Sequence, residues 1–285
     1  MGKVLSDAAL AQLDEDGYTA PVQVLTPEEV ARYRAHLEGF EAKHPEHTKK
    51  LKSKSQVLCP WVVELAETPR LMDAFGDFVG PDVLLWNMAW RVKKADGSTF
   101  AGWHQDFAYG GEMKPRLIIG ALALSECGRE QGCLKVIPGS HKQKPLPHQD
   151  FDDPTSILAR GQQITVDFDK SVAVDLALKA GEIAFFNCNV IHGSAPNLGP
   201  DRRLMCLVEM IPPSAYRTDG IKDTAMLLRG TDTFHNFEDE PRPDAEFSPE
   251  AQANWKHIID KRAKLIFEGS TLAVSEAYGG QRAAY

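Results

Sequence analysis

The sequence lacks a dominant basic cluster, a long apolar run and internal repeats, which are features of nucleic-acid-binding, membrane and repeat proteins. Its 285 residues carry a formal net charge of −8, and Lys and Arg are dispersed, so no nucleic-acid partner is expected. No apolar run approaches the roughly 18 residues of a membrane span, and the N-terminus lacks the apolar stretch of a secretory signal. No internal repeat or low-complexity segment stands out. We therefore expect neither a nucleic-acid nor a membrane partner.

Cysteine is scarce, and the spacing of the cysteines shows no pairs. The five cysteines are an odd number, are scattered, and form no Cys-x-x-Cys pair. This pattern favours buried free thiols in a reducing compartment over a disulfide framework. The sequence therefore predicts a cytoplasmic protein and leaves its oligomeric state open.

A single short segment is rich in lysine. Residues 49–54 read Lys-Lys-Leu-Lys-Ser-Lys. A solvated helix end or loop is the interpretation we favour over a nucleic-acid site. A mobile lid that carries positive charge toward an anionic substrate is the alternative.

Helix signals lie near both ends of the chain. Thr26, Pro27 and Glu29 form a capping box with proline at the first helical position, which predicts a helix to about residue 43. A second helix is expected over 69–79. A third is expected to begin after Ser248 and run to about residue 267.

The middle of the chain has the character of β-strands. Helical patterns do not alternate with these strands, so a parallel βαβ sheet is disfavoured and a sandwich or double-sheet jelly roll is favoured. We expect one domain over 1–285, with a helical part (about 1–80), a jelly-roll core (about 81–215) and a C-terminal loop and helix (about 216–285). The polar stretches 139–170 and 214–247 are expected to be loops at the barrel mouth. The strand-like runs are 83–92, 117–124, 132–137, 171–178, 182–191 and 203–211.

His104, Asp106 and His192 are the candidate metal ligands. On a strand, residues two apart point to the same face, so His104 and Asp106 can meet one ion while Gln105 faces away. His192 follows an apolar run and precedes a turn-forming segment, which makes it the best third ligand. Two imidazoles and one carboxylate are the ligand set of a mononuclear non-haem Fe(II) site with open positions. We interpret the other histidines, including His148, as structural or solvated.

An arginine pair follows the last histidine of this set. A planar guanidinium suits a bidentate grip on a carboxylate, so an arginine here could hold the far end of a dicarboxylate cosubstrate. Arg203 is preferred to Arg202, whose side chain should point to the opposite face of the strand. The residues together suggest an enzyme that activates O2 with 2-oxoglutarate.

Longer strings around these residues resemble a known family. The chain is similar to the phytanoyl-CoA dioxygenase-like branch of the Fe(II)/2-oxoglutarate oxygenases over roughly residues 10–215. The order and spacing of the motifs match. The matching strings are Trp103-His104-Gln105-Asp106, GCLKVIPGSHK (132–142), Lys179-Ala180-Gly181-Glu182, HGSAPN (192–197) and Arg202-Arg203.

The resemblance implies a fold, a site and a reaction. It implies a double-stranded β-helix (jelly-roll, cupin-like) core with flanking helices, and Fe(II) bound by His104, Asp106 and His192. It implies that Arg203, assisted by Ser194, holds the distal carboxylate of 2-oxoglutarate. Asn87 occupies a position that is often a polar cosubstrate or substrate contact, and a buried structural amide is the alternative. The cosubstrates implied are 2-oxoglutarate and O2.

Asp106 bears on the type of reaction. Some relatives halogenate carbon, and they carry a small residue in place of the carboxylate ligand, which frees a position for chloride. The carboxylate here therefore predicts hydroxylation, or desaturation begun by the same hydrogen abstraction, with release of succinate and CO2. The competing class is a non-catalytic jelly-roll protein that binds a metal or ligand.

The substrate is only loosely constrained. We expect a small polar or anionic metabolite, because no basic patch suited to the phosphates of coenzyme A is evident. Arg91 could bind a substrate anion or form a surface salt bridge, and the aromatic residues could equally be core or lid packing. The candidates for the pocket wall are Trp86, Trp90, Arg91, Phe107, Tyr109 and Arg116.

Overall fold

The computed structural model describes residues 3–106 and 112–267, together with residues 270, 272 and 274. Five α-helices are found in this part of the chain: α1 (Asp7–Asp16), α2 (Pro27–Lys43), α3 (Pro60–Ala66), α4 (Pro69–Val79) and α5 (Pro249–Ile266). Short 3-10 helices occupy Pro45–Lys52 (η1), Ser55–Val57 (η2) and Ser140–Lys142 (η4). The strands are β1 (Tyr18–Gln23), β2 (Val83–Lys93), β3 (Ala101–His104), β4 (Met113–Lys114), β5 (Ile118–Ala123), β6 (Leu134–Val136), β7 (His148–Gln149), β8 (Gln163–Ile164), β9 (Val174–Leu176), β10 (Glu182–Asn187), β11 (His192–Ser194), β12 (Arg203–Ile211), β13 (Tyr216–Arg217), β14 (Thr224–Arg229) and β15 (Glu238–Asp239).

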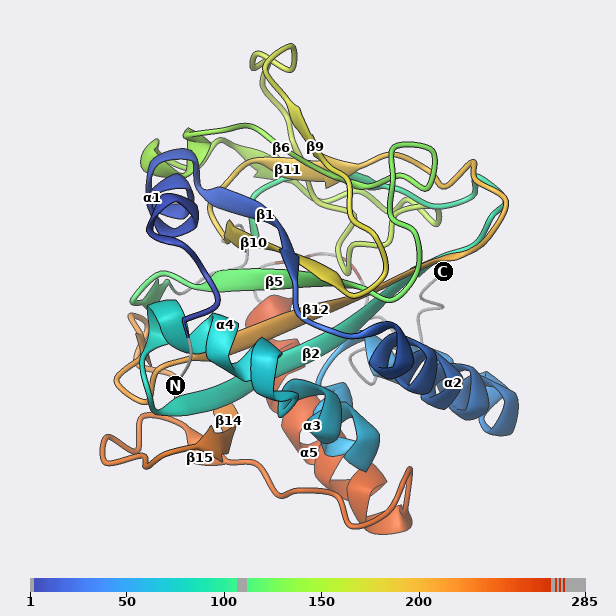
Figure 1. The fold of residues 1–285 in the computed structure, drawn as a ribbon, viewed down its shortest axis with the longest axis vertical. Helices are drawn as coiled ribbons and strands as arrows, with labels where there is room; N and C mark the ends of the chain where they lie inside the picture. The colour runs from blue at the N-terminus through green and yellow to red at the C-terminus, as the bar shows by residue number, and fades with distance from the viewer. Residues whose placement is uncertain (1–2, 107–111, 268–269, 271, 273, 275–285) are drawn as a thin grey trace.

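Two β-sheets face one another and form the predicted jelly-roll core (Figure 1). The larger sheet has the strand order β1-β10-β5-β12-β2-β14-β15, and the smaller has the order β3-β11-β6-β9. All pairings in both sheets are antiparallel except that between β14 and β15. The expected all-β core with flanking helices is therefore confirmed.

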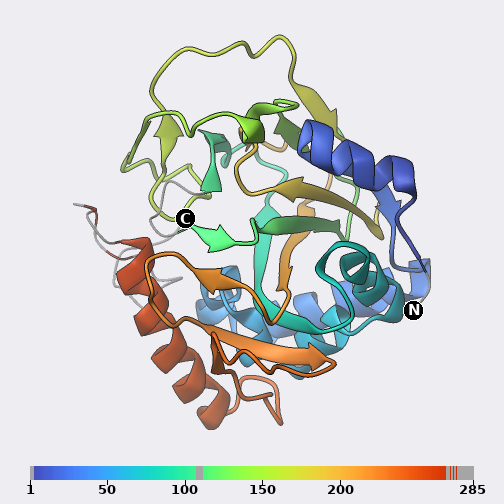
Figure 2. The ribbon, with the colours of Figure 1, turned by 90° about the vertical axis from the view of Figure 1, so that its left-hand side faces the viewer.

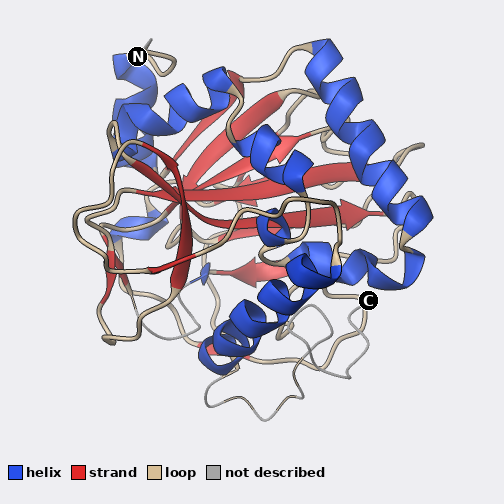
Figure 3. Ribbon diagram, turned by 90° about the horizontal axis from the view of Figure 1, so that it is seen from below, coloured by secondary structure: helices blue, strands red, loops and turns tan. Residues whose placement is uncertain are grey.

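Two apolar clusters hold this arrangement together. One lies between the helices and the outer face of the larger sheet, where Phe75 of α4 meets Phe185 of β10 edge to face. The other lies between the sheets and includes Ile119 of β5 and Val136 of β6. Figure 3 shows the helices spread over the larger sheet. The helices cover the outer face of the larger sheet. Its inner face, which is turned toward the smaller sheet, can therefore carry the polar side chains of a site.

The helix predictions at both ends are confirmed. The Thr26 hydroxyl accepts a hydrogen bond from the Glu29 backbone at 3.2 Å, and the Glu29 carboxylate accepts one from the Thr26 backbone at 2.8 Å. α4 ends at Gly80, and Ser248 caps α5. α1, α3 and β1 were not predicted from the sequence. Pro21 lies inside β1, and proline removes a donor from the ladder, so this edge strand lacks the usual strand pattern.

An irregularity in β2 changes which of its residues face inward. Glu209 pairs with Asn87 and Met210 pairs with Leu85, so Trp86 is an extra residue on β2. Such a bulge re-aims the side chains beside it. Trp86 and Asn87 therefore both reach the cavity between the sheets.

The lysine-rich segment agrees only in part with the solvated helix end or loop that we expected, because Lys49, Lys50 and Lys52 end a helix and are partly exposed, whereas Lys54 is buried. Residues 45–52 form η1, and Lys54 is fully buried in a left-handed conformation. Its ammonium forms an ion pair with the buried carboxylate of Glu240 and donates to the carbonyl oxygens of Trp86 and Thr224. The burial of Lys54 also argues against a mobile lid at this position. A lysine can be buried only with such partners, and these come from the far end of the chain.

The two long polar segments are only partly loops. The first contains β7 and β8, and the second contains β13, β14 and β15, with β14 extending the larger sheet. Figure 2 shows α5 along one side of the molecule, next to these C-terminal strands. Both segments contribute residues to the cavity, as expected for the mouth of the barrel. No helix in the described part of the chain is long and apolar enough to cross a membrane.

Candidate metal centre and adjoining cavity

His104 and His192 are cross-strand neighbours. His104 ends β3, His192 begins β11, and the two residues are direct register partners. Directly opposite residues on an antiparallel pair place their side chains close together. Their ring centroids are 4.1 Å apart, and both residues are buried. The pairing of two distant strands therefore brings together the two imidazoles that the sequence analysis selected.

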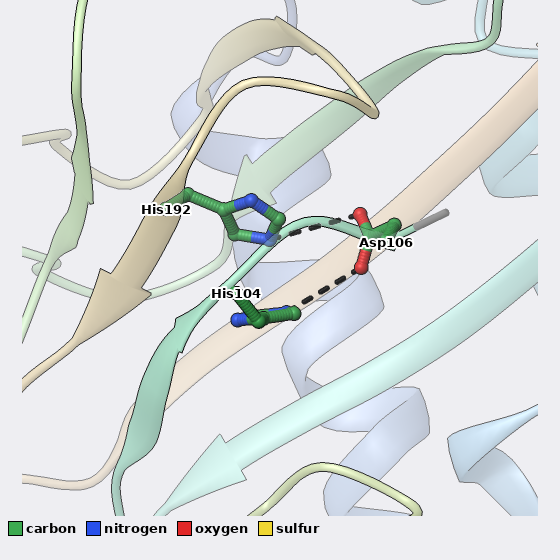
Figure 4. A group of neighbouring side chains, drawn as sticks. All are labelled: His104, Asp106 and His192. Atoms are coloured by element: carbon green, nitrogen blue, oxygen red, sulfur yellow. Dashed lines mark ion pairs between the residues drawn. The ribbon is translucent and has the colours of Figure 1, made fainter. Parts of the chain in front are cut away.

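Asp106 completes the group from two residues beyond His104. One carboxylate oxygen lies 3.4 Å from Nε2 of His104, and the other lies 3.6 Å from Nε2 of His192 (Figure 4). The Asp106 backbone N–H donates to the carbonyl of Cys188 at 3.0 Å, which fixes the chain at this point. The three ligand atoms lie within 4.8 Å of one another. This spacing is compact enough for one metal ion to bind all three.

Backbone carbonyls set the orientation of both imidazoles. Nδ1 of His104 lies 2.8 Å from the carbonyl of Gly102, and Nδ1 of His192 lies 2.9 Å from that of Val190. Because a carbonyl oxygen only accepts, each Nδ1 carries a proton, and Nε2 is the ring nitrogen that lies toward Asp106. Hydrogen bonds of this kind commonly orient metal-binding histidines. Both rings are thus held ready to bind a cation beside Asp106.

The protonation states also suit a metal site. Burial, followed by the nearby His104, lowers the pKa of His192 to about 4, so its ring is neutral at pH 7. Burial alone would raise the pKa of Asp106, but His192 and His104 outweigh that effect and lower it below its usual value. Metal binding needs neutral imidazole and ionised carboxylate. The two residues therefore hold the required forms at neutral pH.

Gln105 faces away from the three ligands, as predicted, and ties the motif to neighbouring loops. Its amide donates to the carbonyl of Asn189 at 2.7 Å and accepts from the Leu146 backbone at 2.9 Å. The Gln105 backbone N–H donates to Nε2 of His148 at 2.9 Å. His148 was interpreted as structural, and its half-buried ring does hold the backbone next to His104.

A second buried group of charges lies where β2 and β12 pair. Arg203 and Lys93 are register partners, and both are almost completely buried. Arg203 donates to the carbonyl of Gly132 at 2.7 Å, while its Nε has no hydrogen-bond partner among the described residues. Lys93 donates to the hydroxyl of Ser194 at 2.6 Å. Burial, followed by the Arg203 charge, lowers the pKa of Lys93 to about 6.

This cationic group has the chemistry of an anion site. Neither Lys93 nor Arg203 has a carboxylate partner among the described residues, and a buried guanidinium is normally paired with an anion. Arg202 points elsewhere, because its guanidinium bonds Glu41 of α2 at 2.7 Å. Of the two candidate arginines, Arg203 is therefore the one that can meet a ligand inside the barrel, with Ser194 beside it.

A cavity of about 160 Å³ adjoins Asp106. Its apolar wall includes Leu117, Ile119 and Leu207 from the inner face of the larger sheet. Polar and charged side chains occupy another part of the wall. These are Asn87, Arg91, Gln162, Glu209, Arg217, Asp223 and Arg262.

The predicted cavity residues divide into three groups. Trp86, Asn87 and Arg91 line the cavity. Trp90 does not, because it packs on the outer face of β2 against Trp61 of α3, and Arg116 lies at the protein surface outside the cavity. Phe107 and Tyr109 lie outside the described residues. We therefore correct the prediction that Trp90 and Arg116 form part of the pocket wall.

Asn87 was predicted to contact the cosubstrate or the substrate, with a buried structural amide as the alternative, and it lies on the cavity wall away from Arg203. It lies six residues before Lys93 on β2, about 20 Å along the strand. Its side-chain oxygen accepts from the Lys54 backbone at 2.8 Å, and its amide bonds Glu209. These contacts favour the alternative of a buried structural amide, and they remove Asn87 from the cationic group.

Lys93 and Glu209 are among the buried charged residues that were not predicted from the sequence. Lys93 follows Arg91 by two positions, so both occupy the same face of an otherwise apolar strand. Glu209 is the sole acidic residue in the apolar run of β12, and it follows Arg203 by six positions. A lone charge on the inner face of a buried strand is the signal that could have identified both.

Comparison with known proteins adds independent information. A family model described as phytanoyl-CoA dioxygenase (PhyH) matches residues 13–205. An ectoine dioxygenase of Streptomyces coelicolor is 27% identical over 227 residues, which cover 69% of this chain and 74% of that protein. The peroxisomal phytanoyl-CoA dioxygenase of Bos taurus is 30% identical over 136 residues, covering 45% of this chain and 40% of the relative.

Solved structures resemble the whole fold. The apo form of the non-heme monooxygenase ThoJ covers 91% of this chain and 97% of its own, with a TM-score of 0.79 and 27% identity. CytC3 with Fe(II) and alpha-ketoglutarate covers 87% of this chain and 98% of its own, with a TM-score of 0.64 and 19% identity. At that identity, the likeness to CytC3 speaks for the fold alone.

Proposed function

The chain belongs to the phytanoyl-CoA dioxygenase family and is a 2-oxoglutarate-dependent dioxygenase, and from this premise we propose that it hydroxylates a C–H bond of a small polar metabolite. The proposed centre is Fe(II) held by His104, Asp106 and His192. The expectation of an enzyme is confirmed by the family, so the alternative of a non-catalytic binding protein is not retained.

The donor set supports Fe(II) as the metal. Two imidazoles and one carboxylate converge, and a backbone carbonyl lies within hydrogen-bond distance of Nδ1 of each imidazole. This combination is typical of non-haem Fe(II) sites that keep open positions for a cosubstrate and O2. Bound there with 2-oxoglutarate and O2, iron supplies the oxidising power that attacks a C–H bond, with release of succinate and CO2.

The buried cations support 2-oxoglutarate as the cosubstrate. Arg203 and Lys93 offer several N–H donors in a dry environment, and Ser194 adds a hydroxyl. The distal carboxylate of 2-oxoglutarate would pair with both cations. A charge-assisted hydrogen bond of this kind is stronger than one between neutral groups.

The rest of the chain positions the substrate and excludes water. Leu117, Ile119 and Leu207 give the cavity an apolar wall next to Asp106. Holding a substrate in one orientation beside the metal is the main contribution that a protein makes to such a reaction. Asp106 occupies the position that a halide would need, which supports hydroxylation over halogenation.

Arg91 is the proposed contact for an anionic group of the substrate. It lines the cavity, and its guanidinium donates to the carbonyls of Lys52 and Trp90, with no ion pair recorded among the described residues. Relatives of this chain act on ectoine, so ectoine belongs among the compounds tested first. The small cavity supports a metabolite over a long acyl chain.

The domain organisation and compartment are also proposals. The larger sheet combines strands from residue 18 to residue 239, which supports one catalytic domain over 1–285. All five cysteines are buried and unpaired, which supports a reducing cytoplasm.

A spectroscopic experiment tests the cofactor proposal. The purified protein is mixed anaerobically with Fe(II) and 2-oxoglutarate, and the weak visible charge-transfer band of the chelated cosubstrate is recorded. We expect a band in the native protein and in Arg202→Ala, because Arg202 points away from the interior. In Arg203→Ala the band should be weaker at the same 2-oxoglutarate concentration, by about tenfold in apparent affinity or more.

Two results would contradict the proposal. One is the absence of the band in native protein whose circular dichroism shows it to be folded. The other is an Arg203→Ala variant that binds 2-oxoglutarate as tightly as Arg202→Ala. Under air, substrate-dependent succinate release that persists in His104→Ala would also count against the assigned metal ligands.

A further inference from the structure

Glu209 is a buried carboxylate that faces the cavity without a full set of partners. It lies on the inner face of β12 and is only 7% exposed. Its Oε2 atom accepts no hydrogen bond within the described residues, and the nearest recorded cation is Nη2 of Arg262, 3.8 Å away. A buried carboxylate is normally paired and hydrogen-bonded. Glu209 therefore has room for a further donor from the cavity.

The neighbouring charges do not remove this deficit. Arg262 lies between Glu209 and Asp223, with its Nη1 atom 3.5 Å from the Asp223 carboxylate, and its guanidinium stacks on Trp86. Arg262 is thus divided between Glu209 and Asp223, and Asp223 also accepts a hydrogen bond from Nε1 of Trp86 at 2.8 Å. Arg217 also borders the cavity, and it is engaged by Asp219. Oε2 of Glu209 therefore keeps its unsatisfied position on the cavity wall.

The electrostatic environment of Glu209 agrees with this description. Burial raises the pKa of Glu209 above its ordinary value, and the Arg262 charge offsets that effect only in part. Asp106 raises it further, while Asn87 and Arg91 lower it. A cationic ligand group beside Glu209 would relieve both the desolvation and the missing hydrogen bond.

Arg91 gives the cavity a positive end. It lies on the inner face of β2, opposite Met205, and Met205 is four residues before Glu209 on β12. The two charged positions are thus separated by about 13 Å of strand. Their long side chains extend into the same cavity, which also borders Asp106. A ligand that lies between them would be close to the metal centre.

We propose that the substrate is a small zwitterion, with a cationic nitrogen held by Glu209 and an anionic group held by Arg91. The nitrogen is an ammonium or amidinium group, because these donate charged hydrogen bonds to a carboxylate. The cavity of about 160 Å³ suits a molecule of amino-acid size. This inference rests on the proposed function, since it assigns a substrate class to the same site.

A binding experiment with matched probes tests the inference. The full chain is loaded anaerobically with Fe(II) and 2-oxoglutarate, and the visible band is recorded first, which checks the cofactor site. Calorimetry then measures binding of common L-amino acids and their N-methyl and amidine derivatives. Each probe is paired with its 2-hydroxy acid and its N-acetyl form, which keep the carboxylate and lose the cation.

We expect at least one cationic probe to bind about tenfold or more tightly than its uncharged-nitrogen counterparts. Glu209→Gln should reduce that binding about tenfold or more while the visible band stays unchanged. Glu209→Asp should restore part of the affinity. Glu64→Gln is the matched control, because Glu64 is an exposed carboxylate on α3 that does not line the cavity.

Three outcomes would overturn the inference. The 2-hydroxy acids could bind as tightly as the amino acids, Glu209→Gln could bind the cationic probe as tightly as native protein, or no cationic probe could bind although the band is present. Each of these leaves the proposed dioxygenase function standing. Loss of the band in the native protein would instead contradict the cofactor proposal, so the two failures are distinguishable.

Discussion

At the scale of single residues, Lys93 has the most unusual environment in the interior. It has no exposed surface, lies opposite Arg203, and donates to the Ser194 hydroxyl. With a pKa of about 6, its side chain is largely neutral at pH 7.5 in the absence of an anion. A bound carboxylate would raise that pKa, because an opposite charge favours the ammonium form.

We therefore predict that 2-oxoglutarate binding takes up close to one proton at pH 7.5. Because the protonated lysine is the form that holds the carboxylate, the affinity should fall as pH rises above 6, by up to about tenfold per pH unit. Calorimetry in two buffers with different ionisation enthalpies measures the proton uptake. Lys93→Met should bind more weakly and take up almost no proton, and equal uptake by this variant would refute the assignment.

At the scale of the elements, the N-terminus of α2 shows how a local signal fixes a helix. Thr26 and Glu29 form reciprocal hydrogen bonds that satisfy two of the free backbone donors there. This contact needs no partner from elsewhere in the chain, which is why it could be recognised from four consecutive residues.

We predict that Thr26→Ala lowers the free energy of unfolding by about 1 kcal/mol, because the cap bond to Glu29 is lost. For a chain of this length, the corresponding fall in melting temperature is roughly 2–3 °C. Differential scanning calorimetry measures both quantities. Thr26→Ser retains the hydroxyl and should be close to native stability, whereas equal losses in the two variants would show that the cap bond is not the cause.

The elements that escaped the sequence analysis lack such local signals. β1 contains Pro21 and gains its place by pairing with β10, more than 150 residues away. Lys54 is found in a polar run, and only the distant Glu240 allows its burial. The proposed metal ligands could be selected because His104 and Asp106 are two residues apart and His192 lies in a specific string. Glu209 has no such string, and its role depends on the register of β12 with β2.

At the scale of the whole molecule, a buried polar cluster joins the two ends of the chain. Lys54 forms an ion pair with Glu240, and the Thr224 hydroxyl and the Gln56 amide donate to the same carboxylate at 2.6 and 2.9 Å. The Lys54 backbone also donates to Asn87 on the cavity wall. The cluster thus connects the N-terminal helical part to β14, β15 and the cavity.

We predict that Lys54→Met lowers the free energy of unfolding by about 3–5 kcal/mol, because it leaves the Glu240 charge buried without its partner. The double variant Lys54→Met/Glu240→Gln removes both charges and should recover at least about 1 kcal/mol of that loss. Urea unfolding followed by tryptophan fluorescence measures the difference. A double variant that is less stable than Lys54→Met would contradict this account of the pair.

The family match ends at residue 205, whereas Glu209, Arg217, Asp223 and Arg262 all follow it. The proposed ligands for iron and 2-oxoglutarate fall within the matched part, from Lys93 to Arg203. Arg91, Leu117 and Ile119 of the cavity wall also lie within the matched part. The stretch after β12 adds Arg217, Asp223 and Arg262 to that wall. Changes confined to this stretch would therefore alter one side of the substrate cavity while leaving every proposed ligand for iron and 2-oxoglutarate in place.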